Sequence, residues 1–317
     1  MTKRKIYFRA DASATIGYGH FVRTLALADM LKNDFDCTFF TSSPSAYQIE
    51  EMGKVCNHIS LNEETKFEDF INLLEGDEIV VLDNYFYTTE YQKQIKEKGC
   101  KLACVDDLHN RHFVCDLILN PALLSDSQYD AESYTVMCLG LEYALLRRPF
   151  LQQNNMVTKK TGSWLLAFGG SDYDNMTEKY LSFLQDDERV KSITVIVGDA
   201  YKYHDNLKKY SKASVYKNLT AEEMSVKMQQ TEYAVLPSST ISIEALACGC
   251  KIANGYFVDN QIETAEMYKR EGYSLGLGDL HEVSDASFID ELLHFKSHRG
   301  IDFSLIPNRY KQIFKSL

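Results

Sequence analysis

The sequence predicts an α/β protein built from two units in tandem, each with a parallel sheet between layers of helices. Short apolar runs alternate with segments of helical spacing along nearly the whole chain. Such runs are typical of parallel strands, because helices cover both faces of their sheet. The alternation stops in a polar stretch at 152–162 and then starts again. The 317 residues are enough for two domains of ordinary size.

The first unit, placed at residues 1–150, opens with an apolar strand at 6–9 and a helix at 21–31. In the helix, apolar residues recur at three- and four-residue spacing and so fall on one face. The remaining elements follow the same logic of apolar run and amphipathic segment. They are strands at 37–40, 79–82, 102–105, 117–119 and 136–139, and a helix at 89–98 that ends at Gly99.

The second unit, placed at residues 163–300, repeats the pattern. Its expected strands are 164–168, 193–197, 233–236 and 252–254, and its expected helices are 175–184, 221–229, 241–247 and 261–271. A last helix at 308–315 lies in a tail, 301–317, that we expect to return to the first unit. The sequence therefore predicts two Rossmann-like domains that face each other across a cleft. In open sheets of this kind ligands bind beyond the carboxyl ends of the strands.

The composition excludes some functions. A formal net charge of −11 argues against binding along a nucleic acid, because phosphate backbones require a basic surface. No apolar stretch has the length of a signal peptide core or a membrane span, so we expect a cytoplasmic protein without membrane insertion. The eight cysteines are then expected to be reduced. None forms a Cys-x-x-Cys pair, so no metal site is predicted.

The first candidate for chemistry follows strand 6–9. Two glycines, Gly17 and Gly19, lead into a helix that begins at His20. Unpaired N–H groups and the positive end of the helix dipole suit an anion there, and they favour a neutral imidazole. A neutral histidine in a cleft can accept a proton from water. The turn lacks the third glycine of the dinucleotide fingerprint, and a structural turn with a capping histidine remains the alternative.

The second unit carries a similar turn. Gly169, Gly170 and Ser171 lie between a strand and a helix, where they can form an anion cradle. The alternative is a plain connection between the two elements.

A third candidate follows strand 233–236. Ser238, Ser239 and Thr240 precede a helix and offer hydroxyl and N–H groups to a diphosphate. One turn further, the carboxylate of Glu244 can accept hydrogen bonds from both hydroxyls of a ribose. The alternative is a helix with a Ser/Thr cap and an exposed acid.

Polar residues also mark three further strand ends. They are Asp83, Asn84 and Tyr85, then Asp106 and Asp107, and finally Asp259, Asn260 and Gln261. Such residues are commonly turn formers or helix caps. Their number on the expected cleft side favours contact of some of them with a ligand.

Together these segments resemble a known family, the UDP-2,4-diacetamido-2,4,6-trideoxy-β-L-altropyranose hydrolases (PseG) of pseudaminic acid biosynthesis. The resemblance spans nearly the whole chain in the expected order. It is carried by Arg9-Ala10-Asp11-Ala12-Ser13, Ile16-Gly17-Tyr18-Gly19-His20 with Arg23, Asp83-Asn84-Tyr85, Val105-Asp106-Asp107, Asn120, the run 140–150, Phe168-Gly169-Gly170-Ser171-Asp172, the Glu244 helix and Asn260-Gln261.

The resemblance implies a GT-B-like architecture related to the glycosyltransferase that adds GlcNAc in peptidoglycan lipid synthesis. It implies a UDP-sugar hydrolase of class EC 3.6.1 that needs no metal or cofactor. Water attacks the anomeric carbon, UDP leaves, and His20 is the base. UDP is held mainly by the second unit and the sugar by the first. The implied binding residues are Asp11, Gly17, Tyr18, Gly19, Arg23, Asp83, Tyr85, Gly169, Gly170, Ser171, Ser238, Ser239, Thr240, Glu244, Asn260 and Gln261.

The chain departs from the family in two places. Pro237-Ser238-Ser239-Thr240 stands where the family has a Ser-Ala-Gly-Gly type loop, and the tail after Tyr273 carries no assignable motif. The sugar can therefore be a stereoisomer or a differently acylated relative. The sequence is silent on oligomeric state, and a monomer is slightly favoured.

Two other functions stay open. A glycosyltransferase on the same scaffold would use His20 to deprotonate an acceptor hydroxyl, although no basic or apolar membrane-docking patch is evident. UDP release without an acceptor separates hydrolysis from transfer. A non-catalytic nucleotide-sugar-binding module is the third possibility, and His20 speaks against it.

Overall fold

The computed structural model describes residues 3–13, 17–152, 158–297 and 300–317. Its contacts divide the chain into two compact units. Unit 1 comprises residues 1–148 and 302–317, and unit 2 comprises residues 149–301. Residues 153–157 of the polar stretch expected between the domains, and residues 14–16 of the His20 turn, lie outside the described residues.

Unit 1 is built on a seven-stranded sheet in the order β3-β2-β1-β4-β5-β7-β9, and all its pairings are parallel. The strands are β1 (Lys5–Arg9), β2 (Asp36–Ser42), β3 (Asn57–Leu61), β4 (Ile79–Asp83), β5 (Lys101–Val105), β7 (Leu117–Asn120) and β9 (Val136–Leu139), with a small sheet of β6 (His112–Phe113) and β8 (Asp130–Ala131). The helices are α1 (Gly19–Leu31), α2 (Ala46–Val55), α3 (Lys66–Asn72), α4 (Thr89–Glu97) and α12 (Ile306–Ser316), with 3-10 turns η1 (Asp126–Gln128), η2 (Leu141–Tyr143) and η4 (Phe303–Leu305).

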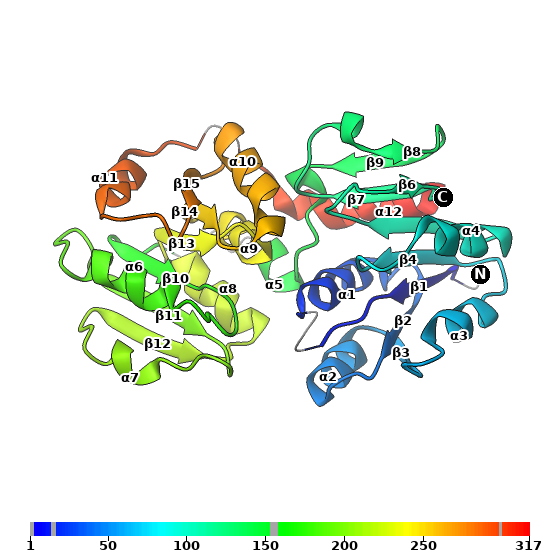
Figure 1. Cartoon of the computed structure of the whole chain (residues 1–317), viewed down its shortest axis with the longest axis horizontal. Helices are drawn as coiled ribbons and strands as arrows, with labels where there is room; N and C mark the ends of the chain where they lie inside the picture. The colour runs from blue at the N-terminus through cyan, green and yellow to red at the C-terminus, as the bar shows by residue number, and fades with distance from the viewer. Residues whose placement is uncertain (1–2, 14–16, 153–157, 298–299) are drawn as a thin grey trace. The chain divides into compact units, whose positions relative to one another are not determined.

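The central strand of unit 1, β4, is apolar up to its last residue. All five residues of β4, Ile-Val-Val-Leu-Asp, are buried, as a strand covered on both faces requires. The C-terminal helix α12, red in Figure 1, packs beside the blue α1. Phe314 of α12 makes an edge contact with Phe35 at 6.4 Å, and Lys311 and Lys315 each lie 2.9 Å from Asp34.

Unit 2 has a six-stranded parallel sheet in the order β12-β11-β10-β13-β14-β15. The strands are β10 (Ser163–Leu166), β11 (Ser192–Val197), β12 (Ala213–Lys217), β13 (Tyr233–Pro237), β14 (Lys251–Tyr256) and β15 (Leu275–Asp279). The helices are α6 (Met176–Gln185), α7 (His204–Leu207), α8 (Ala221–Gln230), α9 (Thr240–Ala247), α10 (Ile262–Arg270) and α11 (Ser287–His294), with the turn η3 (Asp259–Gln261). The short helix α5 (Arg148–Leu151) lies at the boundary between the units.

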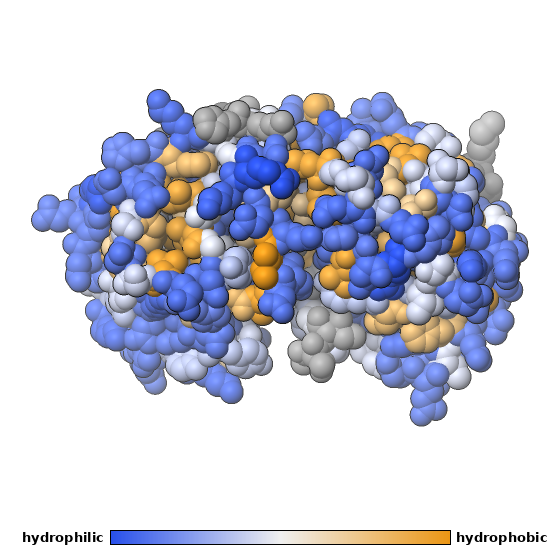
Figure 2. Space-filling view, turned by 45° about the horizontal axis from the view of Figure 1, so that its top comes forward, coloured by the Kyte–Doolittle hydropathy of each residue, from blue (hydrophilic) through white to orange (hydrophobic). Residues whose placement is uncertain are grey.

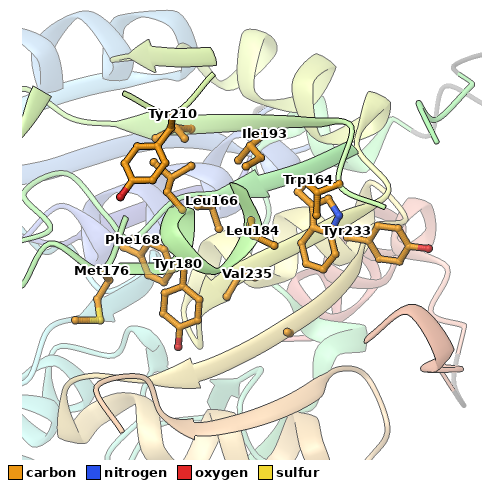
Figure 3. Packing of buried hydrophobic residues seen from close by; sticks show 14 of the residues in the cluster. Trp164, Leu166, Phe168, Met176, Tyr180, Leu184, Ile193, Tyr210, Tyr233 and Val235 are labelled. Carbon is orange, nitrogen blue, oxygen red and sulfur yellow. The ribbon is translucent and has the colours of Figure 1, made fainter. Parts of the chain in front are cut away.

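Aromatic rings fill the core of unit 2 (Figure 3). Trp164 stacks on Tyr233 with ring centroids 5.0 Å apart, and Phe168 stacks on Tyr180 at 5.2 Å. Stacked aromatic pairs of this kind contribute beyond the area that they bury. Trp164 is the single tryptophan of the chain, so its fluorescence reports on this core alone.

The elements that the sequence did not predict lie mostly at the edges of the sheets. The outermost strands β3 and β12 are largely exposed, so they lack the apolar run that marks a buried strand. The other edge strand of unit 2, β15, contains two glycines in Leu-Gly-Leu-Gly-Asp. The short helix α7 has a single apolar residue, so its periodicity is weak. Helix α3 carries Phe67, Phe70 and Ile71 at helical spacing and was not predicted despite this pattern.

Both sheets change direction at a corresponding place. In unit 1 the chain leaves β1 toward β2 and later returns to β4 on the other side of β1. In unit 2 the same reversal separates β10 from β13. Ligands of open α/β sheets bind at these switch points, beyond the carboxyl ends of the strands.

The surface is mainly polar. On the face shown in Figure 2, hydrophilic residues predominate and apolar residues are scattered between them. No helix in the described ranges is long and apolar enough to cross a bilayer.

Candidate active site

His20 lies at the switch point of unit 1. It is the second residue of α1, which follows β1, and its side chain is only 7% exposed. Its Nδ1 lies 2.7 Å from Oδ1 of Asp83, the last residue of β4. The Tyr85 ring meets the imidazole edge-on with centroids 4.6 Å apart. The histidine therefore stands between the carboxyl ends of the two strands at which the sheet reverses.

Asp83 is fully buried and accepts several hydrogen bonds. Arg23 donates from Nε and from Nη2 to its two oxygens, at 2.7 and 2.6 Å, and the Thr24 hydroxyl donates at 2.7 Å. Burial alone would raise the pKa of Asp83, but the charge of Arg23 and the bonds from Arg23 and His20 outweigh it and lower that pKa to about 2. Asp83 is therefore ionised at neutral pH.

Arg23 connects this pair to a second carboxylate. Its Nη1 donates to Oδ2 of Asp107 at 2.9 Å, and the Tyr85 hydroxyl donates to the same oxygen at 3.2 Å. The guanidinium thus bridges the ends of β4 and β5 and sits one helical turn from His20. Sequence reasoning placed Arg23 and Asp83 among substrate-binding residues, whereas the structure pairs them with each other and with the histidine.

The pairing fixes the tautomer of His20. Arg23 Nη2 also lies 3.1 Å from Nδ1, but a guanidinium cannot accept a hydrogen bond. Among the residues that the structure describes, the only acceptor at Nδ1 is the Asp83 carboxylate, so Nδ1 carries the proton. In the neutral ring Nε2 is then the acceptor, and it makes no hydrogen bond to the described residues. Such an imidazole can take a proton from water.

Asp11, predicted to contact substrate, is instead a buried hub of unit 1. Its carboxylate pairs with both Nη atoms of Arg9 and accepts from the Ser42 amide at 2.8 Å and from Lys66 at 3.1 Å. Its backbone exchanges two hydrogen bonds with the Asn84 side chain. Burial opposes ionisation, but the bond and charge of Arg9 prevail and lower the pKa of Asp11 to about 2. Asp11 ties β1 to the ends of β2 and β4.

The residues before His20 are open to solvent. Tyr18 and Gly19 are exposed, and a Cβ at Gly17 or Gly19 would meet nothing within 4 Å. Gly17 has a φ of +84°, which explains the need for glycine there. Tyr18 is the N-cap of α1 and its side chain makes no capping hydrogen bond, so within the described part of the chain the first N–H groups of this helix have no side-chain cap.

In unit 2 the turn after β10 differs from the expectation. Gly169 and Gly170 are exposed and Gly169 has a φ of +92°. However, α6 begins only at Met176, and the Asp172 carboxylate accepts from the amides of Met176 and Thr177 at 2.8 and 2.9 Å. An acid of the chain itself therefore occupies the N-terminus of α6. The exposed amides of the turn remain as anion donors.

A close approach of two glycines shapes this turn. A Cβ on Gly198, which follows β11, would lie 2.5 Å from the carbonyl oxygen of Gly170. Gly170 itself has open space where its own Cβ would stand. The turn therefore rests on the backbone of the neighbouring strand end.

The turn after β13 is held by a buried polar chain. Ser274 donates to the Asn254 side chain at 2.5 Å, and Asn254 Nδ2 donates to the Ser238 hydroxyl at 2.8 Å. Ser238 is buried, whereas Ser239 and Thr240 at the start of α9 are partly exposed. No side chain caps α9 in the described structure, so its first amides suit an anion.

The other predicted residues of unit 2 are placed as follows. Glu244 lies one turn into α9 and is 2% exposed. Asn260 is exposed in η3, and Gln261 folds back to accept from the Phe257 amide at 3.2 Å. The structure thus brings the turns of Gly169 and Ser238 to the carboxyl ends of the adjacent strands β10 and β13.

Sequence reasoning missed several residues of these sites. Thr24 and Lys66 in unit 1 and Asn254 and Ser274 in unit 2 contact the predicted residues directly. Asn254 could have been predicted from the sequence, because a polar residue inside a buried strand needs a hydrogen-bond partner. Thr24 and Lys66 carry no such signal, since helices commonly contain both residue types on solvated faces.

One acidic group in the described residues has the spacing of a metal site. Glu75, Asp77 and Glu78 bring carboxylate oxygens within 4.8 Å of one another, and Lys5 pairs with all three. It lies before β4, at the opposite end of the strand from Asp83. We assign it no function.

Comparison of the sequence with known proteins finds distant relatives, and no family model matches. The chain is 29% identical over 283 residues to the UDP-2,4-diacetamido-2,4,6-trideoxy-β-L-altropyranose hydrolase of Campylobacter jejuni, covering 86% of this chain and 98% of that protein. It is also 29% identical over 308 residues, 90% of this chain, to an uncharacterised protein of Methanocaldococcus jannaschii, of whose length it spans 62%. Identity to the Bacillus subtilis spore coat polysaccharide biosynthesis protein SpsG is 24% over 307 residues, 93% of this chain and 90% of that protein.

Comparison of structures establishes the fold. The chain matches the Acinetobacter baumannii MurG with a TM-score of 0.58 at 12% identity, covering 97% and 95% of the two chains. It matches a glycosyltransferase from Rickettsia africae at 0.61 and 12% identity, covering 100% and 94%. The calicheamicin glycosyltransferase CalG4 gives 0.62 at 10% identity, covering 100% and 95%. The predicted fold is confirmed: two parallel α/β sheets of GT-B type.

Proposed function

We propose that this chain hydrolyses a UDP-linked 2,4-diacetamido-2,4,6-trideoxy sugar to UDP and the free sugar, with His20 as general base. The observation that carries the proposal is the hydrogen bond of 2.7 Å between His20 Nδ1 and the ionised, buried Asp83. The similarity of the chain to the Campylobacter jejuni hydrolase along most of both sequences supports the choice of substrate.

In the proposed reaction a water oxygen attacks the anomeric carbon of the sugar. The bond between that carbon and the β-phosphate oxygen breaks, and its electron pair leaves with UDP. The water proton passes to Nε2 of His20, and the nearby Asp83 carboxylate stabilises the imidazolium that forms. Direct displacement by water inverts the configuration at the anomeric carbon.

UDP is a good leaving group, so the reaction does not strictly need a general acid. What it needs is a positioned water and donors for the diphosphate charge. We assign these donors to unit 2: the amides of Gly169, Gly170 and Ser171, and the start of α9 at Ser239 and Thr240. The Glu244 carboxylate is assigned to the ribose, and Asn260 and Gln261 remain candidates for the sugar nucleotide.

The burial of His20 also favours water as the acceptor. An imidazole that is 7% exposed leaves little room beside it for a large acceptor alcohol. The oxygen that it activates must therefore be small. This argument favours hydrolysis over transfer to a second sugar, the other activity that a GT-B fold would accommodate.

A proton NMR time course tests the proposal. The purified protein is mixed with candidate UDP-diacetamido-trideoxy sugars, and the anomeric signals report both turnover and configuration. We expect UDP and free sugar with inverted configuration, without added acceptor or metal. The same substrates with His20→Ala protein provide the control for background hydrolysis.

The time course also decides between the alternatives. UDP release that requires an added acceptor alcohol would replace hydrolysis by transfer. Binding of UDP without turnover of any donor would leave a nucleotide-sugar-binding module.

A further inference from the structure

The Gly169 turn continues into a segment in which every residue makes a hydrogen bond or ion pair with another part of unit 2. We define residues 172–175 as the anchor segment. Asp172 caps α6, the Tyr203 hydroxyl donates to the Tyr173 carbonyl at 3.0 Å, and the Tyr201 hydroxyl donates to Asn175 Oδ1 at 2.8 Å. Asp172 and Asn175 have φ values of +40° and +53°, so the backbone adopts left-handed conformations that non-glycine residues rarely take.

The remaining attachment of the anchor segment is ionic. Nε2 of His281 lies 3.2 Å from Oδ2 of Asp174, and Nδ1 of the same ring lies 3.0 Å from Oδ1 of Asp279 at the end of β15. A carboxylate only accepts hydrogen bonds, and a neutral imidazole has one N–H to donate. Both contacts therefore form together only when His281 is protonated.

The groups around His281 favour that proton. The bond to Asp174 has the largest effect and raises the pKa of His281 above its ordinary value. Burial opposes it, and the bond to Asp279 and the charges of both carboxylates add to the increase. From α6, the Lys179 ammonium donates to the carbonyl oxygens of Leu280 and His281 at 3.0 and 2.5 Å. Glu282 follows in the chain and is exposed. Histidine is the side chain whose ordinary pKa lies near neutral pH.

We propose that His281 is a pH-dependent positioning residue for the diphosphate-binding turn, 169–171. This inference rests on the proposed function, which assigns that turn to UDP. When His281 is protonated, Asp174 is held and the turn keeps the conformation in which its amides face the ligand. Deprotonation removes one of the two bonds and lets the anchor segment relax, so that UDP binds more weakly.

The direction of the pH effect follows from the raised pKa. The attachment is complete below the ordinary histidine pKa of about 6.5 and is lost as the pH rises through the higher value in the folded protein. The ring and both carboxylates are more than a third exposed, so the effect is small. We expect the wild-type Kd for UDP to rise about threefold more between pH 6 and pH 9 than that of a variant without the imidazole.

The experiment is a calorimetric titration of the full chain with UDP from pH 6 to pH 9. His281→Gln removes the charge, and His281→Arg keeps a charge at every pH. The terminal phosphate of UDP also titrates near pH 6, so each variant is compared with wild type at the same pH. His112→Gln is the matched control, because His112 in unit 1 also lies between two carboxylates, Asp130 and Glu132, at 2.9 and 3.3 Å.

We expect His281→Gln to bind about threefold more weakly than wild type at pH 6 and equally at pH 9. His281→Arg should retain the pH 6 affinity at pH 9, and His112→Gln should follow wild type throughout. A constant ratio of His281→Gln to wild type at all pH values overturns the inference while leaving the proposed function intact. If the wild-type protein binds no UDP at any pH, the proposed function falls and takes the inference with it.

Discussion

The two units present opposite kinds of chemistry at equivalent places in the same fold. At the switch point of unit 1, the buried side chains of His20 and Asp83 and the partly buried Arg23 are charged or ionisable, and they hydrogen-bond to one another. At the switch point of unit 2, the turns of Gly169 and Ser239 offer mainly backbone amides and hydroxyls. One sheet edge is suited to proton transfer and the other to holding an anion.

This difference has an energetic side. Buried ion pairs are costly to break, since the partner that remains is a buried uncompensated charge. Unit 1 therefore depends on its charges for stability, and in the proposed reaction also for chemistry. In unit 2, the only hydrogen-bond partners of the capping Asp172 carboxylate among the described residues are two amides, so its loss leaves no charged partner there. The predictions below test whether the two units differ in this way.

The largest effect is expected for His20→Ala. The variant should lower kcat by roughly 10²–10⁴, because no positioned base remains, and should leave UDP affinity unchanged. Steady-state kinetics and a UDP titration measure the two quantities. His58→Ala, on the edge strand β3 of the same sheet, is the control and should change neither. An unchanged kcat in His20→Ala would remove the proposed mechanism.

Asp11→Asn should cause the largest loss of stability. It leaves the fully buried Arg9 without a charged partner, which typically costs about 3–5 kcal/mol. In urea unfolding, the circular dichroism transition of unit 1 should move to lower urea while Trp164 fluorescence of unit 2 does not. Asp36→Asn, an exposed acid at the start of β2, should have no measurable effect. Equal shifts of both probes would show that the units unfold together.

Acid should weaken unit 1 selectively. Asp11 and Asp83 have a pKa of about 2 in the folded protein and about 3.9 when unfolded. Their contribution is complete above pH 4 and is lost as the pH falls through 2, by about 2 kcal/mol for each group. Urea midpoints at pH 4.5 and pH 2.5 measure it. Asp11→Asn should lose less stability over this interval than wild type, and an equal loss would contradict the assignment.

Asp172→Ala should give the smallest effect. Loss of the helix cap is expected to lower the stability of unit 2 by about 1 kcal/mol, seen in the Trp164 transition. Asp186→Ala at the other end of α6 is the matched control and should be neutral or slightly stabilising, because an acid there faces the negative end of the helix dipole. A loss of several kcal/mol in Asp172→Ala would erase the contrast between the units.

Most of the architecture could be predicted from the sequence. Uninterrupted apolar runs such as β4 and β13 were predictable, because burial on both faces leaves few alternatives. Edge strands such as β12 were not, because their pairing rests on backbone hydrogen bonds that leave no pattern in a half-exposed sequence.

The candidate sites were predictable in position but less so in detail. The glycine turn marked His20 at the start of a helix, but nothing local indicated that its partner would be Asp83, 63 positions later in the chain. For the same reason Asp11 looked like a ligand contact, because its pairing with Arg9 and Lys66 depends on the tertiary fold. In the Gly169 turn, the sequence did not reveal that Asp172 would reach the first amides of α6.

The contact between Gly198 and Gly170 has a consequence for how this chain can vary. A methyl group at position 198 would collide with the backbone carbonyl of Gly170. A backbone atom cannot move aside as the end of a flexible side chain can, so an alanine there displaces the whole turn. Position 53, where an added carbon meets nothing within 4 Å, has no such limit. In a library of random variants selected for UDP binding, position 198 should remain glycine, whereas position 53 should accept many residue types.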